Sequence, residues 1–294
     1  MLSLTYGEWL RQQLGCKVQK IALNAGFTCP NRDGRVGHGG CTYCNNQTFN
    51  PGYCATQKSV TQQLEEGKAF FSRKYPDMKY LAYFQAYTNT YAAVEHCIAL
   101  YEEALAVPDV VGLVIATRPD CMPSALLDYL TQLNQRTFLI VEYGVESASD
   151  DTLRWINRGH TWQQSVEAIH ETARRGIRVG AHLILGFPGD TREELIRQAR
   201  LVASLPLTTL KLHQLQVIRG TRMALEYERH PWPMPTVEEY IQLVRDYVRQ
   251  LPPTMLLERF VSSSPAELLL APKWGLKNHE FMDLLRKSLS TSWT

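Results

Sequence analysis

The sequence lacks a long uninterrupted apolar run. No stretch of its 294 residues approaches the ~18 consecutive apolar residues that indicate a membrane-spanning helix. Residues 1–16 contain Glu8 and Arg11 and have no apolar core of the kind that a secretory leader requires. We therefore expect neither a spanning helix nor a leader, and no membrane partner.

A surplus of charge of one sign is also absent. The chain has 31 Lys and Arg residues against 29 Asp and Glu residues, which leaves a formal net charge of +2. This charge is too small to indicate a nucleic-acid partner by itself, although it permits a local basic surface. Low-complexity segments are missing, and 45% of the residues are hydrophobic, so the composition is that of an ordinary soluble globular protein.

An even set of cysteines, which would suggest a disulfide framework, is missing as well. The chain has seven cysteines, three of them clustered at ligand spacing, which favours a reducing compartment and a cytoplasmic location. Cys16 and Cys97 receive no predicted role. Cys121 could donate a hydrogen atom or bind substrate, and Cys54 could touch the cysteine loop, but a packed thiol without a role is the simpler interpretation of both.

What the sequence does contain is a cysteine loop, CPNRDGRVGHGGCTYC. In it Cys29, Cys41 and Cys44 are spaced C-x11-C-x2-C directly after a short apolar run. The closely spaced pair can reach one metal centre, and the glycines of the spacer let the backbone curl so that Cys29 joins it. Three ligands suit an iron-sulfur cluster with one open iron, whereas a structural zinc site needs four ligands, with His38 as a possible fourth. On the loop alone both sites remain possible.

Helix and strand patterns alternate along most of the chain. We expect six strands, at residues 20–23, 80–85, 110–116, 137–143, 177–185 and 209–217. We expect helices at residues 4–14, 59–74, 92–106, 124–134, 161–175 and 190–204. Thr161 is a predicted N-cap, Gly176 a predicted C-terminal glycine, and Asp190 with Glu193 a predicted capping box.

This βα alternation predicts a parallel sheet with right-handed crossovers. Six strands fall short of a closed barrel of eight, so the fold class is α/β with a partial, TIM-like (β/α)6 barrel. From Pro231 onward the composition changes, and we expect a barrel unit at 1–230 and a small C-terminal extension at 231–294. The extension should contain a helix at 237–250, a further strand at 254–260 and a helix at 278–289, and either covers the open side of the barrel or forms an appendage.

The segments after the predicted strands are rich in Gly, Thr and charged residues. They read FQAYTNT, ATRPD, YGVES, ILGFPGD and VIRGT. Because functional loops of such barrels lie at the carboxyl ends of the strands, we expect these segments and the cysteine loop to share one rim.

Together these motifs resemble the radical S-adenosylmethionine (SAM) superfamily. The resemblance lies in the three cysteines with Tyr43 before the last, in GVES after the fourth strand and in GAHLILGFPG on the fifth. INRGHTWQQSV and KLHQLQVIRGT resemble the elongator-like branch, and CPNRDG, GGCTYC, FQAYT and TRPDC resemble its bacterial YhcC/YtqA-like subfamily, over residues 5–276. The spacer of eleven residues between Cys29 and Cys41 is longer than the commonest loop of the superfamily, and a longer spacer is a feature of this branch.

The resemblance implies a [4Fe-4S] cluster on Cys29, Cys41 and Cys44, with SAM on the fourth iron and an external one-electron donor. Reductive cleavage of SAM would then give a 5′-deoxyadenosyl radical. The resemblance also implies contacts to SAM from Tyr43, Thr88, Thr117, Glu146, Arg158 and His182.

Each of these implied contacts has a simpler alternative. Glu146 and Arg158 would lie on the ribose and carboxylate of SAM, or would form only an ion pair with each other. Thr117 and His182, on strand ends, could be packed or hydrogen-bonded within the protein. No general acid or base can be named.

The predicted substrate is the side chain of a wobble uridine in tRNA, because the resemblance is to a branch that acts there. Several basic residues and two tyrosines should lie near the barrel mouth, where they could neutralise phosphates and stack on bases. They are Arg32, Arg35, His38, Arg158, His160, Arg219, Arg222, Arg259, Tyr43 and Tyr87. The alternatives are a radical enzyme that acts on a small molecule or a protein side chain, and a non-catalytic iron-sulfur or zinc protein.

Overall fold

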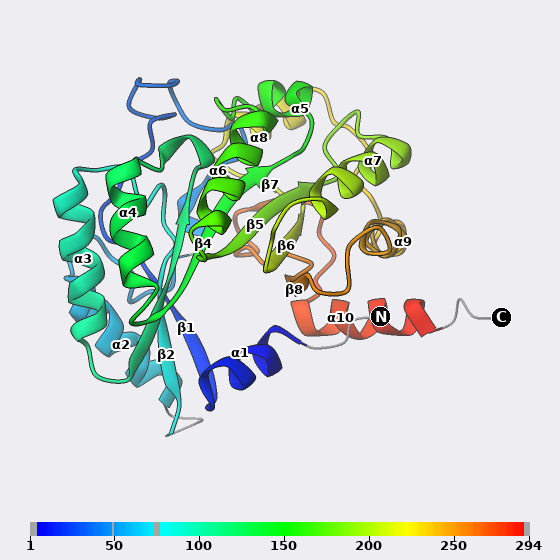
Figure 1. Cartoon of the computed structure of the whole chain (residues 1–294). Coiled ribbons are helices and arrows are strands. Elements are labelled where there is room, and N and C mark those ends of the chain that lie inside the picture. Colours follow the sequence, from blue (N-terminus) through cyan, green and yellow to red (C-terminus); the bar gives the residue numbers. More distant parts are fainter. Residues whose placement is uncertain (1–4, 49, 73–76, 291–294) are drawn as a thin grey trace.

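The computed structural model describes residues 5–48, 50–72 and 77–290, and a seven-stranded parallel sheet forms its centre. The strands follow the order β1-β2-β3-β4-β5-β6-β8, and the sheet curls into a half-barrel (Figure 1). Their bounds are β1 (Val18–Leu23), β2 (Lys79–Phe84), β3 (Val110–Thr117), β4 (Phe138–Glu146), β5 (Arg178–Leu185), β6 (Thr209–Gln214) and β8 (Leu256–Arg259). The predicted partial barrel is therefore confirmed, and its sheet contains one strand more than the six expected there.

Helices cover the outer side of this sheet (Figure 1). Those on and beside this layer are α2 (Val60–Ser72), α3 (Val94–Ala106), α4 (Ser124–Leu133), α6 (Trp162–Arg174), α7 (Arg192–Ala203), α9 (Val237–Val248) and α10 (Asn278–Ser290). Their apolar side chains and the outward side chains of the strands form the main hydrophobic core. Because each strand is followed by a helix that returns along the outside, the carboxyl ends of all the strands meet on one rim.

A second, smaller core closes the opposite end of the barrel. The helix α1 (Tyr6–Leu14) begins at a capping box between Thr5 and Glu8, and its Leu10 packs against inward side chains of β2, β3 and β4. The barrel interior is thus filled from below by α1 and stays open toward the rim where the cysteine loop lies.

The seventh strand comes from the segment in which the sequence predicted a further strand, at residues 254–260. It lies beside β6 and runs parallel to it, so this part of the predicted extension completes the sheet. The stretch predicted as one strand at 209–217 is instead β6 and a separate β7 (Val217–Ile218), which pairs antiparallel with β9 (Leu269–Ala271). The predicted boundary between residues 230 and 231 remains a prediction.

Two short α-helices and two 3₁₀ turns lie near the rim. They are α5 (Asp150–Trp155), α8 (Arg222–Arg229), η1 (Asn46–Thr48) and η2 (Pro119–Cys121). Among the residues described, no helix combines the length and the apolar character needed to cross a membrane.

The helix ends predicted from local sequence signals can be compared with those in the structure. Thr161 caps α6 in a complete capping box with Gln164, and Gly176 follows this helix with a φ of 75°, as predicted. The predicted cap at Asp190 is wrong by one residue, because Thr191 accepts the hydrogen bond from the backbone N–H of Glu194. The Asp190 carboxylate instead accepts from the backbone N–H of Phe187, at 3.3 Å, and so closes the preceding turn.

Candidate active site

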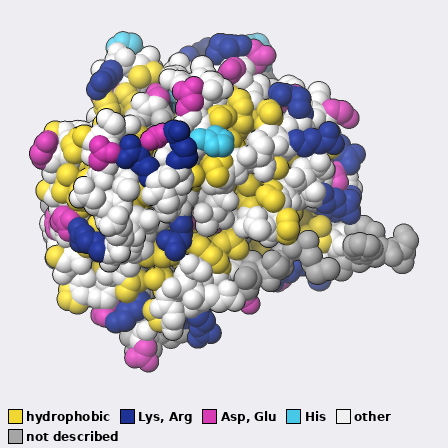
Figure 2. Space-filling model, in the orientation of Figure 1, with side chains coloured by type: hydrophobic (Ala, Val, Ile, Leu, Met, Phe, Trp, Pro, Cys, Tyr) yellow, Lys and Arg dark blue, Asp and Glu magenta, His cyan; other side chains and the backbone are white. Residues whose placement is uncertain are grey.

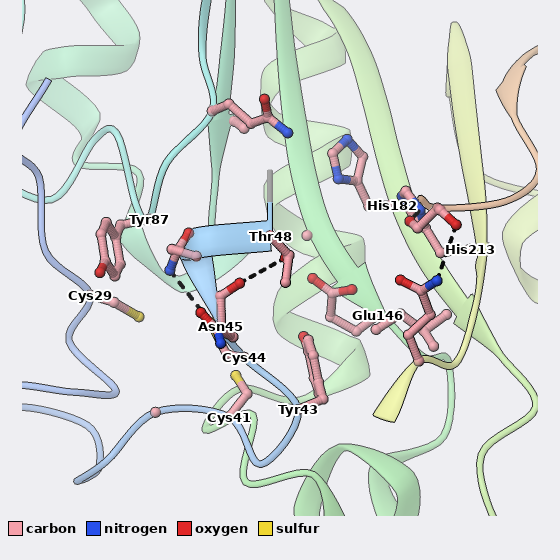
Figure 3. Close-up of a pocket in the computed structure, with 18 of the residues that line it drawn as sticks. Cys29, Cys41, Tyr43, Cys44, Asn45, Thr48, Tyr87, Glu146, His182 and His213 are labelled. Atoms are coloured by element: carbon pink, nitrogen blue, oxygen red, sulfur yellow. Dashed lines mark hydrogen bonds between the residues drawn. The ribbon is translucent and has the colours of Figure 1, made fainter. Parts of the chain in front are cut away.

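All nine residues that the sequence singled out line one pocket at the rim of the barrel. They are Cys29, Cys41, Tyr43, Cys44, Thr88, Thr117, Glu146, Arg158 and His182. Figure 3 shows the cysteines on one side of this pocket and Glu146, His182 and His213 on the other. The strand-end segments therefore meet on one rim, as the βα pattern predicted.

The cysteine loop is held in place by the segment INRGH, residues 156–160. The backbone N–H of Thr42 donates to the carbonyl of Ile156 at 2.9 Å. The side chain of Asn157 donates to the carbonyl of Gly40 at 2.9 Å, and the side chain of Asn31 donates back to the carbonyl of Asn157. This reciprocal pair fixes the loop against the end of α5, so a motif that served as a family marker in the sequence has a structural role.

The glycines of the loop act in two ways. Gly34, Gly39 and Gly40 have positive φ values, as the predicted curl requires. Gly37 has an ordinary φ but leaves room for a neighbour, because a Cβ there would lie 2.3 Å from the side-chain oxygen of Asn31. The curl brings Cys29 to the same pocket as Cys41 and Cys44, which are separated by only two residues in the sequence.

Hydrogen bonds reach two of the three thiols. Cys41 Sγ accepts from Asn31 and from Arg158, each at 3.6 Å, and Cys44 Sγ accepts from Asn46 at 3.6 Å. Burial, and then the neighbouring thiol of Cys41, raise the pKa of Cys44 to about 12. Three clustered thiols cannot all ionise unless positive charge joins them, so this set suits a positively charged metal group.

The residues described include no group of three His, Cys, Asp or Glu side chains close enough to hold a single metal ion. His38, the possible fourth zinc ligand, is exposed and lies over Gly34 without lining the pocket. With three thiols in the lining and no fourth ligand from His38, the set fits a cluster with one open iron better than a closed zinc site.

Thr88 and Thr117 both line the pocket but differ in how their hydroxyl groups are used. Thr88 is completely buried, and its hydroxyl has no hydrogen-bond partner among the described residues. The hydroxyl of Thr117 is 2.5 Å from that of Thr90. An unpartnered buried hydroxyl in a pocket is a place that a bound ligand would satisfy, so Thr88 fits the implied SAM contact and Thr117 has a partner within the protein.

Glu146 and Arg158 contact each other within the same pocket. Arg158 Nη2 lies 3.5 Å from Glu146 Oε1 and donates to the carbonyl of Gly144 at 2.6 Å. Glu146 has a φ of 69°, rare for a residue with a side chain, and it lies at an irregularity in the pairing of β4 with β5. A Cβ on Gly144 would lie 2.6 Å from Glu146 Oε1, so glycine is needed there for this arrangement.

Tyr43 and His182 are placed by different surroundings. Tyr43 packs against an apolar cluster that includes Phe187 and Met223, and burial, with the nearby Glu146 carboxylate, raises the pKa of Tyr43 far above its usual value. His182 Nε2 lies 2.9 Å from a carboxylate oxygen of Glu142. Both rings therefore have fixed orientations toward the pocket.

The floor of the barrel holds a charge network that the sequence analysis missed. Lys20 of β1 contacts Glu142 of β4 and Glu258 of β8, each at 2.9 Å. Lys211 of β6 contacts the same carboxylates, at 2.7 and 3.3 Å. Burial of Glu142 is outweighed by the charges of Lys20 and Lys211, which hold its pKa well below the usual range. The available signal was a charged residue inside each of several otherwise apolar strands.

The remaining predicted residues are spread more widely. Arg32 and Arg259 line the pocket, whereas His160 is buried beside Arg118 and Arg158. The other cysteines do not line this pocket: the Cys54 thiol donates to the carbonyl of Ala22 at 2.8 Å, and the Cys121 thiol lies 3.8 Å from Asp120. Neither contact indicates a role in the site.

The comparisons with known proteins agree with this geometry. The family model described as "Radical SAM superfamily" matches residues 29–202, and "Radical_SAM C-terminal domain" matches residues 207–291. YtqA of Bacillus subtilis (strain 168), described as uncharacterized, is 40% identical over 280 residues, which cover 95% of this chain and 87% of YtqA.

A more distant relative is the tRNA uridine(34) acetyltransferase of Dehalococcoides mccartyi (strain CBDB1). It is 29% identical over 174 residues, which cover 57% of this chain and 36% of that protein. Among solved structures, the archaeal Methanocaldococcus infernus Elp3 with an N-terminal deletion superimposes with a TM-score of 0.66 at 19% identity, covering 93% of this chain and 62% of that one. This likeness shows that the two proteins share the fold.

Proposed function

Because this chain belongs to the radical SAM superfamily, we propose that it reductively cleaves SAM at a [4Fe-4S] cluster and directs the 5′-deoxyadenosyl radical to the side chain of a wobble uridine in tRNA. The family implies the cluster and SAM as cofactors, and these groups supply the radical chemistry when bound. One observation carries the proposal. The three loop cysteines and the residues expected to touch SAM line a single pocket that continues into the barrel.

In this proposal the chain binds the cluster and SAM, orients them, and excludes water from the reacting centre. Cys29, Cys41 and Cys44 would hold the cluster, and the free hydroxyl of Thr88 would hydrogen-bond SAM. The Glu146 carboxylate would accept from ribose hydroxyls, and the Tyr43 ring would pack beside the adenine. The half-barrel, closed below by α1, keeps water from one side of the reacting centre while its mouth admits a bulky substrate.

Two arginine–tyrosine pairs at the rim support an RNA substrate. The Arg32 guanidinium lies 5.3 Å from the ring centre of Tyr87, and that of Arg35 lies 5.6 Å from the ring centre of Tyr91. Guanidinium groups contact phosphates, and both groups stack on unpaired bases. Figure 2 shows Lys and Arg together with Asp and Glu on the displayed face, and the formal net charge of the chain is +2, so we expect RNA binding to depend on the rim more than on a broad basic surface.

The name of the Dehalococcoides relative also supports tRNA as the substrate class, although that similarity covers only part of either chain. A small molecule or a protein side chain is the alternative substrate. An external one-electron donor is required in each case, because SAM cleavage consumes an electron that the chain itself does not supply.

The test is the production of 5′-deoxyadenosine by the anaerobically reconstituted full chain with SAM and a strong reductant, with and without bulk tRNA. The control is Cys41→Ala. Cluster-dependent production that rises with tRNA, together with an altered uridine in the recovered tRNA, is the expected result. Cleavage indifferent to tRNA would move the substrate to a small molecule or a protein. A chain that binds zinc and cleaves no SAM would contradict the whole proposal.

A further inference from the structure

Two buried guanidinium groups lie behind the cysteine loop, and they differ in how their charge is compensated. Arg118 donates to both carboxylate oxygens of Asp120, each at 2.9 Å. The carboxylate nearest to Arg158 is that of Glu146, at 3.5 Å. Both arginines are less than one-tenth exposed. Arg158 is therefore the less completely neutralised of the two cations.

The guanidinium of Arg158 is directed at the cysteine loop. Its Nη1 lies 3.6 Å from Cys41 Sγ, and its Nη2 donates to the carbonyl of Gly144 at 2.6 Å. A Cβ on Gly144 would lie only 2.8 Å from Nη2, so a side chain at that position would displace this end of the guanidinium. Its Nε has no hydrogen-bond partner within the described part of the chain. The thiol of Cys41 is thus one of the few groups that this buried cation faces.

The three thiols receive unequal numbers of hydrogen bonds. Among the described residues, Cys41 accepts from Arg158 and Asn31, and Cys44 accepts from Asn46. For Cys29 the described residues provide no donor within hydrogen-bond distance of Sγ. Of these three donors, Arg158 carries a charge, and it donates to Cys41. Charged donors make the stronger hydrogen bonds to thiolates.

Reduction adds one negative charge to a cluster that three thiolates already hold. A buried cation in hydrogen-bond contact with one thiolate stabilises the reduced state more than the oxidised state, because Coulomb interactions are strong where water is excluded. Net charge and hydrogen bonds to sulfur are among the features by which a protein sets the potential of such a cluster.

We propose that Arg158 raises the reduction potential of the cluster through its contact with Cys41, and that this is its main contribution, ahead of any contact with the carboxylate of SAM. Arg158 is in this sense a positioning residue that acts through a ligand. The proposal rests on the cluster that the family carries and is independent of the substrate, so it stands or falls separately from the action on tRNA.

The test is a potentiometric titration of the reconstituted full chain, followed by the electron paramagnetic resonance signal of the reduced cluster. The variants are Arg158→Gln, which keeps an N–H donor but loses the charge, Arg158→Lys, which keeps the charge but loses the planar fork, and Asn46→Ala, which removes a neutral donor from Cys44. We expect the midpoint potential to shift to more negative values in all three. The shift should be largest for Arg158→Gln and smaller for Arg158→Lys and Asn46→Ala. The dissociation constant of SAM for the oxidised protein is measured in parallel, so that an effect on the cluster potential can be separated from an effect on SAM binding.

Three results would overturn the proposal. One is an unchanged midpoint potential in Arg158→Gln. Another is a loss of SAM affinity in both Arg158 variants with the midpoint preserved, which would make Arg158 a SAM ligand. The last is a failure of both Arg158 variants to retain iron and sulfide at the level of Asn46→Ala, which would make Arg158 a structural support of the cysteine loop.

Discussion

The two ends of the pocket are built on opposite principles. On the cluster side, three thiols, amide donors and an incompletely neutralised Arg158 lie on loops, fixed by backbone hydrogen bonds and glycines. On the floor, two lysines and two glutamates balance each other's charge, and each projects from a different strand of the rigid sheet. The cluster side is thus arranged to receive a charged group, whereas the floor is electrostatically complete before anything binds.

Removing one of the cysteine ligands should impair the cluster side of the pocket alone. We expect Cys29→Ala, Cys41→Ala and Cys44→Ala each to lose the cluster and all SAM cleavage, because no other thiol lines the pocket to replace the missing one. Iron and sulfide content after reconstitution measures the effect. Cys16→Ala and Cys54→Ala are the matched controls, and a loss of iron in either of them would mean that the ligand set is wrong.

Removing a carboxylate should disrupt the charge network on the floor of the barrel. Glu142→Gln leaves Lys20 and Lys211 with only Glu258 between them in a buried setting, and we expect a loss of about 3–5 kcal/mol in the free energy of unfolding. Urea denaturation of the apo chain measures it. Asp151→Asn, which removes the exposed partner of Arg154, is the control and should leave stability unchanged. Equal stability of Glu142→Gln and the native chain would show that the floor is not the balanced network described above.

Acid should weaken the cluster side before it weakens the Glu142 network. Burial, and then the charges of Arg158 and Arg118, lower the pKa of His160 from 6.5 to about 2. Below pH 6.5 the unfolded chain is therefore protonated at His160 whereas the folded chain is not. The free energy of unfolding falls as the pH drops below 6.5, by about 2 kcal/mol between pH 7.5 and pH 5. Glu142, whose folded pKa is lowered, contributes stability that is lost only as the pH falls below the ordinary value of 4.5.

The measurement is the free energy of unfolding as a function of pH for the native chain and for His160→Gln. The variant should show a smaller slope between pH 6.5 and pH 5. His213 on the floor side, whose pKa is also lowered by burial, should leave part of the slope in place, and the double variant with His213→Gln should flatten it further. A slope identical in all three proteins would contradict the assignment.

The smallest expected effects concern two threonines of the pocket lining, one of which should affect SAM binding and the other the stability of the fold. Thr88→Val removes a hydroxyl that has no partner in the described part of the protein, so it should weaken SAM binding by about 2- to 10-fold without a loss of stability. Thr117→Val removes a hydroxyl paired with Thr90 and should lower stability instead. Calorimetric titration with SAM and thermal unfolding distinguish the two. If Thr88→Val binds SAM as well as the native chain does, the implied contact is wrong.

The same contrast explains how much could be predicted from the sequence. The cysteine loop is local, and its spacing, its glycines and the INRGH segment can be recognised without knowing the fold. The alternation of strands and helices predicted the half-barrel, and the rim residues followed because parallel strands end on one side. The N-cap at Thr161 was also predicted, since a capping threonine before a helical pattern is a local signal.

The floor could not be predicted in this way, because Lys20, Glu142, Lys211 and Glu258 are separated by up to 238 residues and meet only when the sheet curls. The seventh strand was predicted as a strand, but its place in the main sheet was not, because it follows a proline-rich segment that looked like the start of a separate unit. The cap at Asp190 was misplaced because two adjacent residues can both accept hydrogen bonds, and the turn before them decides which one does.

The contact between Lys20 and Glu258 links folding to synthesis. A nascent chain that has not yet emerged past β8 holds two floor lysines but only one of their two carboxylates, so the interior cannot dehydrate without leaving a positive charge unbalanced. The barrel should therefore remain incompletely packed on the ribosome until β8, the last strand of the parallel sheet, has been synthesised. The cofactor would then be loaded into a finished protein, since the pocket that receives it is lined in part by Arg259 at the end of β8.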